Sequence, residues 1–107
     1  MRIFKETSHL SEIIEESNTE PVIIFKFSSE CNSSCRLYNK LEKEILDKTL
    51  KAPVYLVTVQ KQPVLKEKIA EMFNIKHESP QILILIKGKV VYTAHHNSIK
   101  IEDFVFT

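Results

Sequence analysis

Short apolar runs alternate along the chain with longer segments whose apolar residues recur every three or four positions. Three runs, at residues 22–27, 54–59 and 81–86, are rich in β-branched and aromatic residues, which is typical of buried strands. The turn at 87–89 is short enough to make a hairpin with a fourth run at 90–94. The pattern therefore predicts four strands, the last two of them antiparallel.

The segments with helical spacing predict four helices. Their apolar faces are Leu10, Ile13 and Ile14 in a helix over 8–17; Leu37, Tyr38, Leu41 and Ile45 in a helix that runs to about Leu50; Leu65, Ile69, Met72 and Phe73 in a helix from Pro63; and Ile99, Ile101 and Phe104 in a helix over 98–104. Thr7 or Ser8 is available to cap the first helix. Pro53 is expected to end the second, and Pro63 suits the first turn of the third.

The order of these elements predicts the fold class. Strands that alternate with helices pair in parallel, and a closing hairpin adds an antiparallel edge. With a short strand before the first helix, the layout is α/β and thioredoxin-like, with a central mixed sheet of four to five strands flanked by helices. The length of 107 residues suits a single domain over 1–107.

Composition and charge narrow the possible partners. The net charge is +1 with both signs interspersed, so there is no electrostatic footprint for nucleic acid or an anionic membrane. A single glycine, Gly88, excludes the Gly-rich phosphate loops of nucleotide-binding proteins. The apolar run at 82–86 is too short to span a membrane, and the first residues lack the apolar stretch of a signal peptide. We therefore expect a cytoplasmic protein that binds neither nucleic acid nor membrane.

The candidate chemistry lies in two cysteines between the first predicted strand and the second predicted helix. Cys31 falls where a strand ends and a helix begins, and the free N–H groups and dipole of a helix start favour thiolate over thiol. Its thiolate could attack a disulfide sulfur and form a mixed disulfide. The alternative is an inert, half-buried cysteine, but the polar residues around it argue against burial.

Cys35 follows four residues later, and its role stays open. Two cysteines at this spacing in a regular helix hold their Cβ atoms about 5–6 Å apart, whereas a disulfide needs about 3.5–4.5 Å. A bond between them therefore requires Cys31 to lie outside the helix or the first turn to unwind. Cys35 also falls at the edge of the apolar helix face, so it is either a resolving cysteine or a packing residue.

Ser79 and Pro80 open the third predicted strand. An X-Pro bond is cis in only about 5–6% of cases, but a proline at this place in a thioredoxin-like layout favours a cis bond beside the reactive sulfur. His77, His95 and His96 could bind a metal together with the cysteines, but their spacing matches no compact zinc pattern. We predict no metal site.

Several segments resemble a known family, the YtxJ-type monothiol bacilliredoxins of the bacillithiol system. The most discriminating is 76–81, Lys-His-Glu-Ser-Pro-Gln, and the segments at 27–34, 87–92 and 94–96 are also similar. The chain departs from the family at Asn32 and Ser33, where the family usually has Pro and Ile. A further departure is Cys35, where the family generally has no cysteine, so the resemblance does not settle whether one or two thiols take part.

The resemblance implies a thiol–disulfide oxidoreductase that removes bacillithiol or a similar small thiol from oxidised protein cysteines. The small thiol would be a co-substrate, no cofactor would be bound, and the partners would be thiolated or oxidised proteins. Cys31 would attack, and a second small thiol or Cys35 would reduce it again. Asn32, Ser34, Ser79 and Pro80 are the residues expected to bind substrate, with the Ser79 backbone pairing with a bound peptide.

Two alternatives remain at this point. One is a dithiol thioredoxin-like reductase that cycles a disulfide between Cys31 and Cys35. The other is a non-catalytic binding module with a thioredoxin fold, in which Cys31 is incidental. Slow alkylation and an ordinary pKa of the Cys31 thiol would favour the module.

Overall fold

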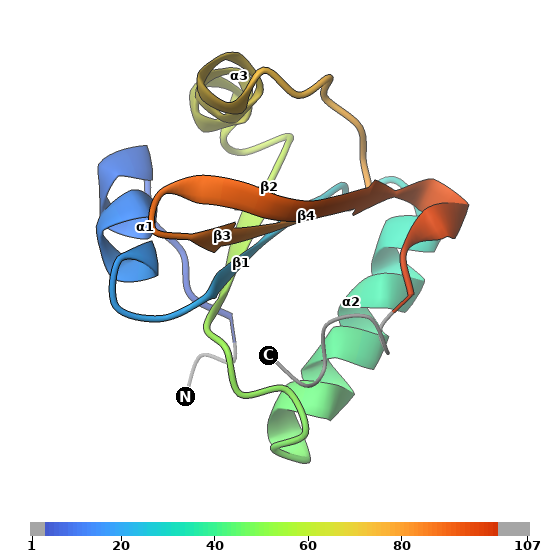
Figure 1. Ribbon diagram of the computed structural model, residues 1–107. Helices are drawn as coiled ribbons and strands as arrows, with labels where there is room; N and C mark the ends of the chain where they lie inside the picture. Colours follow the sequence, from blue (N-terminus) through green and yellow to red (C-terminus); the bar gives the residue numbers. More distant parts are fainter. Residues whose placement is uncertain (1–3, 101–107) are drawn as a thin grey trace.

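Within residues 4–100, which the computed structural model describes, four strands form one mixed sheet in the order β2-β1-β3-β4 (Figure 1). The strands are β1 Val22–Phe27, β2 Val54–Thr58, β3 Gln81–Ile86 and β4 Lys89–His95. β1 pairs in parallel with β2 and antiparallel with β3, and β3 pairs antiparallel with β4. The predicted α/β class, mixed sheet and closing hairpin are confirmed. The parallel pairing predicted for the strands that alternate with helices is right for β1 and β2 but wrong for β3, which runs antiparallel to β1.

The short strand predicted near the start of the chain is reduced to one isolated parallel bridge between Lys5 and Tyr55. The Lys5 N–H donates to the Val54 carbonyl at 2.8 Å, and the Leu56 N–H donates to the Lys5 carbonyl at 2.8 Å. The sheet of the described residues therefore has four strands, the lower of the two predicted numbers.

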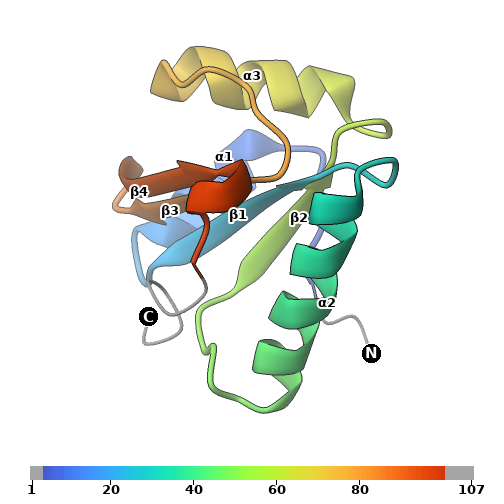
Figure 2. The same cartoon turned by 90° about the vertical axis from the view of Figure 1, so that its right-hand side faces the viewer.

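Helices cover both faces of the sheet. They are α1 Leu10–Ser17, α2 Asn32–Leu46 and α3 Pro63–Phe73. α1 and α3 lie on one face and α2 lies alone on the other (Figures 1 and 2). Among the described residues, no helix is both long and apolar enough to cross a bilayer.

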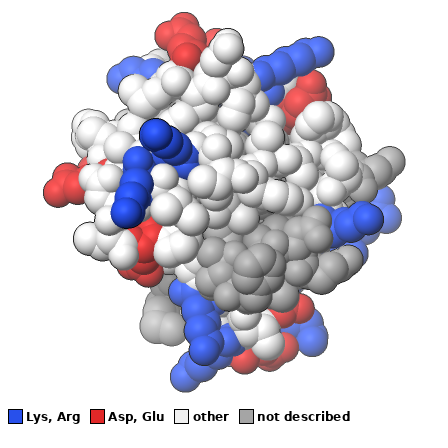
Figure 3. Space-filling view, viewed as in Figure 1, with Lys and Arg blue, Asp and Glu red and all other residues white. Residues whose placement is uncertain are grey.

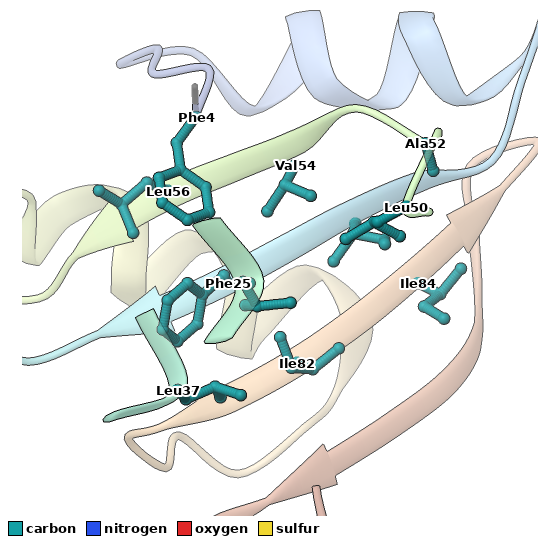
Figure 4. Close-up of a cluster of buried hydrophobic side chains, with 11 residues drawn as sticks. Phe4, Phe25, Leu37, Leu50, Ala52, Val54, Leu56, Ile82 and Ile84 are labelled. Carbon is teal, nitrogen blue, oxygen red and sulfur yellow. The ribbon is translucent and has the colours of Figure 1, made fainter. Parts of the chain in front are cut away.

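The period of two in β1 explains why both faces of the sheet are apolar. Ile23 and Phe25 point into the cluster beneath α2, which Figure 4 shows in close-up. Val22 and Ile24 point into the cluster beneath α1 and α3. Because successive side chains of a strand alternate between faces, an apolar run without interruption predicts a strand buried on both sides. β1 is such a central strand.

The start of α1 and the end of α2 differ from the predictions. α1 begins at Leu10 with His9 as its N-cap and no side-chain cap, so the expected cap by Thr7 or Ser8 is wrong. α2 ends at Leu46, well before Pro53, because the chain turns back at Lys48 in the left-handed region (φ 62°). Leu50 is nonetheless buried, as a loop residue of the α2-side core.

Two further expectations concern α3 and the end of the chain. Met72 is 60% exposed, because the inward stripe of α3 follows Leu65, Ile69 and Phe73 at intervals of four. The helix predicted over 98–104 lies partly outside the described residues. Within them, a 3-10 turn covers His96–Ser98 and is followed by Ile99 in an extended conformation.

Candidate active site around Cys31

The Cys31 thiol lies at the start of α2, where the chain leaves β1. Cys31 is the N-cap of this helix, with extended backbone angles (φ −111°, ψ 121°). Its side chain is partly exposed. The N–H groups of Ser34 and, less strongly, Ser33 lower the pKa of the Cys31 thiol against the opposing effect of desolvation, and the hydroxyls of the same two serines add to this. The site can therefore supply a thiolate more readily than an ordinary cysteine.

Cys35 lies one helical turn further along. Its N–H donates to the Cys31 carbonyl at 3.0 Å, which is the first hydrogen bond of α2. Its Sγ donates weakly to the Ser29 carbonyl at 3.8 Å, and its side chain is partly buried. Both cysteines are free thiols. Because Cys31 is the N-cap and not a helical residue, the first requirement for a disulfide between the two, that Cys31 lies outside the helix, is met.

The two other α2 positions predicted to bind substrate differ in exposure. Asn32 is exposed at the first helical position. Ser34 is fully buried, and its Oγ makes no hydrogen bond of regular geometry within residues 4–100. Its hydroxyl is nevertheless one of the groups that lower the Cys31 pKa. Ser34 thus faces the sulfur, whereas Asn32 faces solvent beside it.

The Ser79-Pro80 bond is cis, as predicted. Pro80 is buried and lines a groove of about 250 Å³ whose other side includes Ser33 of α2. Ser79 is half-buried, and its Oγ has no hydrogen-bond partner among the described residues. The proline loop and the first turn of α2 therefore border one groove, although they are almost fifty residues apart in sequence.

Gln60, in the connection between β2 and α3, holds the loop that precedes Cys31. Its Nε2 donates to Ser28 Oγ at 2.7 Å, and its Oε1 accepts from the Ser29 N–H at 3.3 Å. Sequence reasoning missed this residue because a polar side chain after a strand has no distinguishing pattern. Its position shows that the loop is fixed from a second segment of the chain.

Lys26 is a second residue that sequence reasoning missed. It is completely buried on β1, and its Nζ donates to Gln81 Oε1 at 2.7 Å. Gln81 Nε2 in turn donates to the Lys76 carbonyl at 3.2 Å, which ties β1 to the segment leading to Pro80. Burial, and then repulsion from Lys66, lowers the pKa of Lys26 to about 8. The signal available in the sequence was a lysine within the otherwise apolar run at 22–27.

We expect Lys26→Met to change how stability depends on pH. The folded-state pKa of Lys26 lies below its unfolded value of 10.5, so the unfolded chain binds more protons between about pH 8 and 10.5. The wild-type free energy of unfolding should therefore rise with pH relative to the variant, by about 2 kcal/mol across this window. Urea unfolding at pH 7.5 and 10 measures the difference.

Lys89→Met is the matched control, because Lys89 is exposed on β4 and its loss changes the net charge equally. Its pH profile should run parallel to that of the wild type. If the unfolding free energy of Lys26→Met also changes with pH in parallel with that of the wild type, the buried Lys26 ammonium does not cause the predicted rise in stability.

The three histidines considered as metal ligands make separate contacts in the described part of the chain. His77 Nδ1 is buried without a hydrogen-bond partner in the described part of the chain, and burial, then Lys26, lowers its pKa. His95 and His96 pack edge to face at 5.5 Å, and His96 Nε2 bonds Glu78 Oε1 at 2.9 Å. Between residues 4 and 100, no group of three or more His, Cys, Asp or Glu residues could hold a metal ion.

Comparison with known proteins identifies both a family and a fold. A family model described as monothiol bacilliredoxin BrxC matches residues 3–104. A solved structure of a protein designated an oxidoreductase with a thioredoxin fold is 27% identical, with a TM-score of 0.80 over 94% of this chain and 88% of the other.

Two thioredoxins of known structure are more distant. Oxidised thioredoxin from Plasmodium falciparum is 24% identical, with a TM-score of 0.65 over 86% of this chain and 84% of its own. Thioredoxin from Fasciola hepatica is 18% identical, with a TM-score of 0.65 over 89% and 86% of the two chains. At these identities the likeness shows the fold alone.

Proposed function

The chain belongs to the monothiol bacilliredoxin family and is a thiol–disulfide oxidoreductase, and from this premise we propose that it removes bacillithiol or a similar small thiol from thiolated cysteines of cytoplasmic proteins. The observation that carries the proposal is the thiol of Cys31, partly exposed at a helix N-cap with its pKa lowered by the N–H groups of Ser34 and Ser33. A reducing compartment would keep this thiol available for reaction.

In the first step, the Cys31 thiolate attacks the small-thiol sulfur of a mixed disulfide. The bond between this sulfur and the client cysteine breaks, and the client leaves as a thiolate that takes a proton from solvent. Cys31 is then disulfide-bonded to the small thiol. The helix N–H groups that stabilise the Cys31 thiolate before attack also make it a good leaving group in the next step.

In the second step, Cys31 is regenerated by one of two routes. A second small thiolate attacks the sulfur that Cys31 carries, which forms a symmetrical small-thiol disulfide and frees the Cys31 thiolate. Alternatively, the Cys35 thiolate attacks Cys31 Sγ, which releases the small thiol and leaves a Cys31–Cys35 disulfide for an external reductant. The family supports the first route, and the N-cap position of Cys31 is compatible with the second.

We assign substrate binding to the two segments that border the groove beside Cys31. The Ser79 backbone and Pro80 would contact the extended client segment, and Asn32 would contact the disulfide as it approaches the sulfur. Ser34, predicted to bind substrate, is fully buried and would act instead on the Cys31 thiolate through its N–H and hydroxyl. Support comes from the burial of Pro80 in the groove wall and from Ser79 Oγ, which has no hydrogen-bond partner within residues 4–100. A bound peptide could supply the hydrogen bond that this hydroxyl lacks.

Intact-mass analysis tests the proposed function. Reduced protein is mixed with a peptide that carries bacillithiol in a mixed disulfide, and both masses are followed. The peptide should lose the small thiol, and the protein should gain it as a mixed disulfide. A protein that instead loses two hydrogens forms an internal disulfide, which supports the dithiol alternative. If neither mass changes, the proposal is wrong.

Cys35→Ser separates the two routes of regeneration. The first attack should proceed at the wild-type rate, since Cys35 enters only when the mixed disulfide is resolved. By the monothiol route, turnover with excess small thiol should be within about twofold of the wild type, as for a surface change of small effect. A variant that accumulates the mixed disulfide and turns over only with added thiol, where the wild type does not need it, would identify Cys35 as the resolving cysteine.

A further inference from the structure

The groove beside Cys31 has a lining that thiol exchange itself does not require. Ser33, Arg36 and Lys40 of α2 form one side of it, and Pro80 and His96 lie on the other. Figure 1 shows the turn after β4 beside the amino-terminal half of α2. Ser33 also links the groove to the reactive sulfur, because its N–H is one of the groups that lower the Cys31 pKa. The groove therefore begins within the first turn of α2, two residues after Cys31, although Cys31 is not one of its lining residues.

The groove carries positive charge that nothing in the described chain neutralises. Arg36 and Lys40 are exposed and four residues apart, so they lie on the same side of α2. Neither forms an ion pair or a hydrogen bond to an acidic side chain within residues 4–100. On the opposite wall, the Glu78 carboxylate bonds His96 at 2.9 Å and lies 3.8 Å from Lys76.

This charge is local, because acidic and basic side chains are interspersed over the face shown in Figure 3. A protein of net charge +1 does not attract anions over its whole surface. An anion preference would therefore arise from these two side chains and their position beside the sulfur.

The helix also sets a distance between the sulfur and the cations. At 1.5 Å per residue, Arg36 lies about 8 Å and Lys40 about 14 Å along the helix from Cys31. A thiol of tripeptide size can reach from its sulfur to a carboxylate over about the first of these distances, at about 3.5 Å per extended residue. The long Lys40 side chain leans toward the start of the helix, which brings its ammonium closer to the sulfur than its backbone. A groove of about 250 Å³ suits one small polar molecule better than a folded partner.

We propose that Arg36 and Lys40 bind carboxylate groups of the small thiol while its sulfur is bonded to Cys31, so that they select small thiols that carry negative charge. The inference rests on the proposed function and names the substrate chemistry of the same site. Arg36 offers a planar fork that matches a carboxylate, and Lys40 adds a second point charge for a thiol with two carboxylates.

The test compares two small thiols that differ in charge. One peptide mixed disulfide carries glutathione, which has two carboxylates, and the other carries its dimethyl ester, which has none. The release rate of each is measured for the wild type and for Arg36→Gln/Lys40→Gln. Each exposed contact is worth about 0.2–1 kcal/mol, so the loss of two contacts should lower the acid-over-ester ratio by about twofold to thirtyfold in the double variant. The ester rate should not change, which shows that the site is intact.

Lys43→Gln is the matched control, since it removes one charge from the same helix but from an exposed pair with Asp47, at 3.3 Å, outside the groove. Its acid-over-ester ratio should equal that of the wild type. The wild-type preference should also weaken from 0.05 to 0.5 M salt, as expected for exposed charges.

The outcomes separate this inference from the proposed function. If the wild type releases both thiols and the double variant keeps the wild-type ratio, the groove does not select by charge and only the inference fails. The same conclusion follows if Lys43→Gln lowers the ratio as much. If the wild type releases neither thiol from the peptide, nor bacillithiol from its own mixed disulfide, the proposed function fails and the inference fails with it.

Discussion

Cys31→Ser should abolish disulfide exchange, with a loss on the order of a thousandfold or more. A serine hydroxyl is not appreciably ionised near neutral pH, so the variant has no nucleophile to replace the thiolate that the start of α2 favours. The fold should be retained, because Cys31 is a partly exposed N-cap without a side-chain capping bond to lose. The rate of small-thiol release from a peptide mixed disulfide measures the effect.

Cys35→Ser is the matched control for this variant. It makes the same chemical change four residues away, at a thiol whose side chain makes one weak hydrogen bond within residues 4–100, to the Ser29 carbonyl. It should keep the first exchange step whichever route regenerates Cys31. Full activity of Cys31→Ser would refute the assignment of Cys31, whatever the result for Cys35.

Leu41→Ala should produce a large loss of stability. Leu41 is fully buried in the core between α2 and the sheet, where its cluster includes Phe25 and Ile82. Truncation removes buried apolar area and leaves a cavity that the packed strands cannot close, which costs about 2–5 kcal/mol of unfolding free energy. For a domain of this size that is a large share of the total. Urea unfolding near neutral pH measures the loss.

Leu46→Ala makes the same change on the same helix at a side chain that is 59% exposed. It should alter the unfolding free energy by about 0.5 kcal/mol or less. Equal losses for the two variants would mean that helix propensity, and not core packing, governs the attachment of α2. The comparison matters for function because α2 holds Cys31 at its first turn.

The strands were predictable because their signal is local. β1 and β3 have the predicted bounds, since a run of apolar, β-branched residues is buried on both faces of a central strand wherever it lies in the sheet. The hairpin was predictable for a similar reason. Lys87 and Gly88 both have positive φ, at 51° and 76°, as a tight connection between twisted strands requires.

Helix ends were less predictable because they depend on a few backbone angles and on what the next residues pack against. The apolar spacing extended α2 to Leu50, but Leu50 is a core residue of the following loop. A buried leucine looks the same in sequence whether it lies on a helix or just beyond it. The left-handed turn at Lys48 separates the two cases, and lysine carries no signal for it.

The amino-acid sequence by itself determined the order of elements along the chain, the fold class and a cysteine at a helix start, because these follow from side-chain periodicity and from backbone N–H groups within three residues of Cys31. The tertiary structure decided the surroundings of that cysteine. Gln60, Pro80 and the Lys26–Gln81 pair come from segments that meet only when β1, β2 and β3 assemble. Their burial and contacts depend on distances across the sheet, which no local pattern encodes.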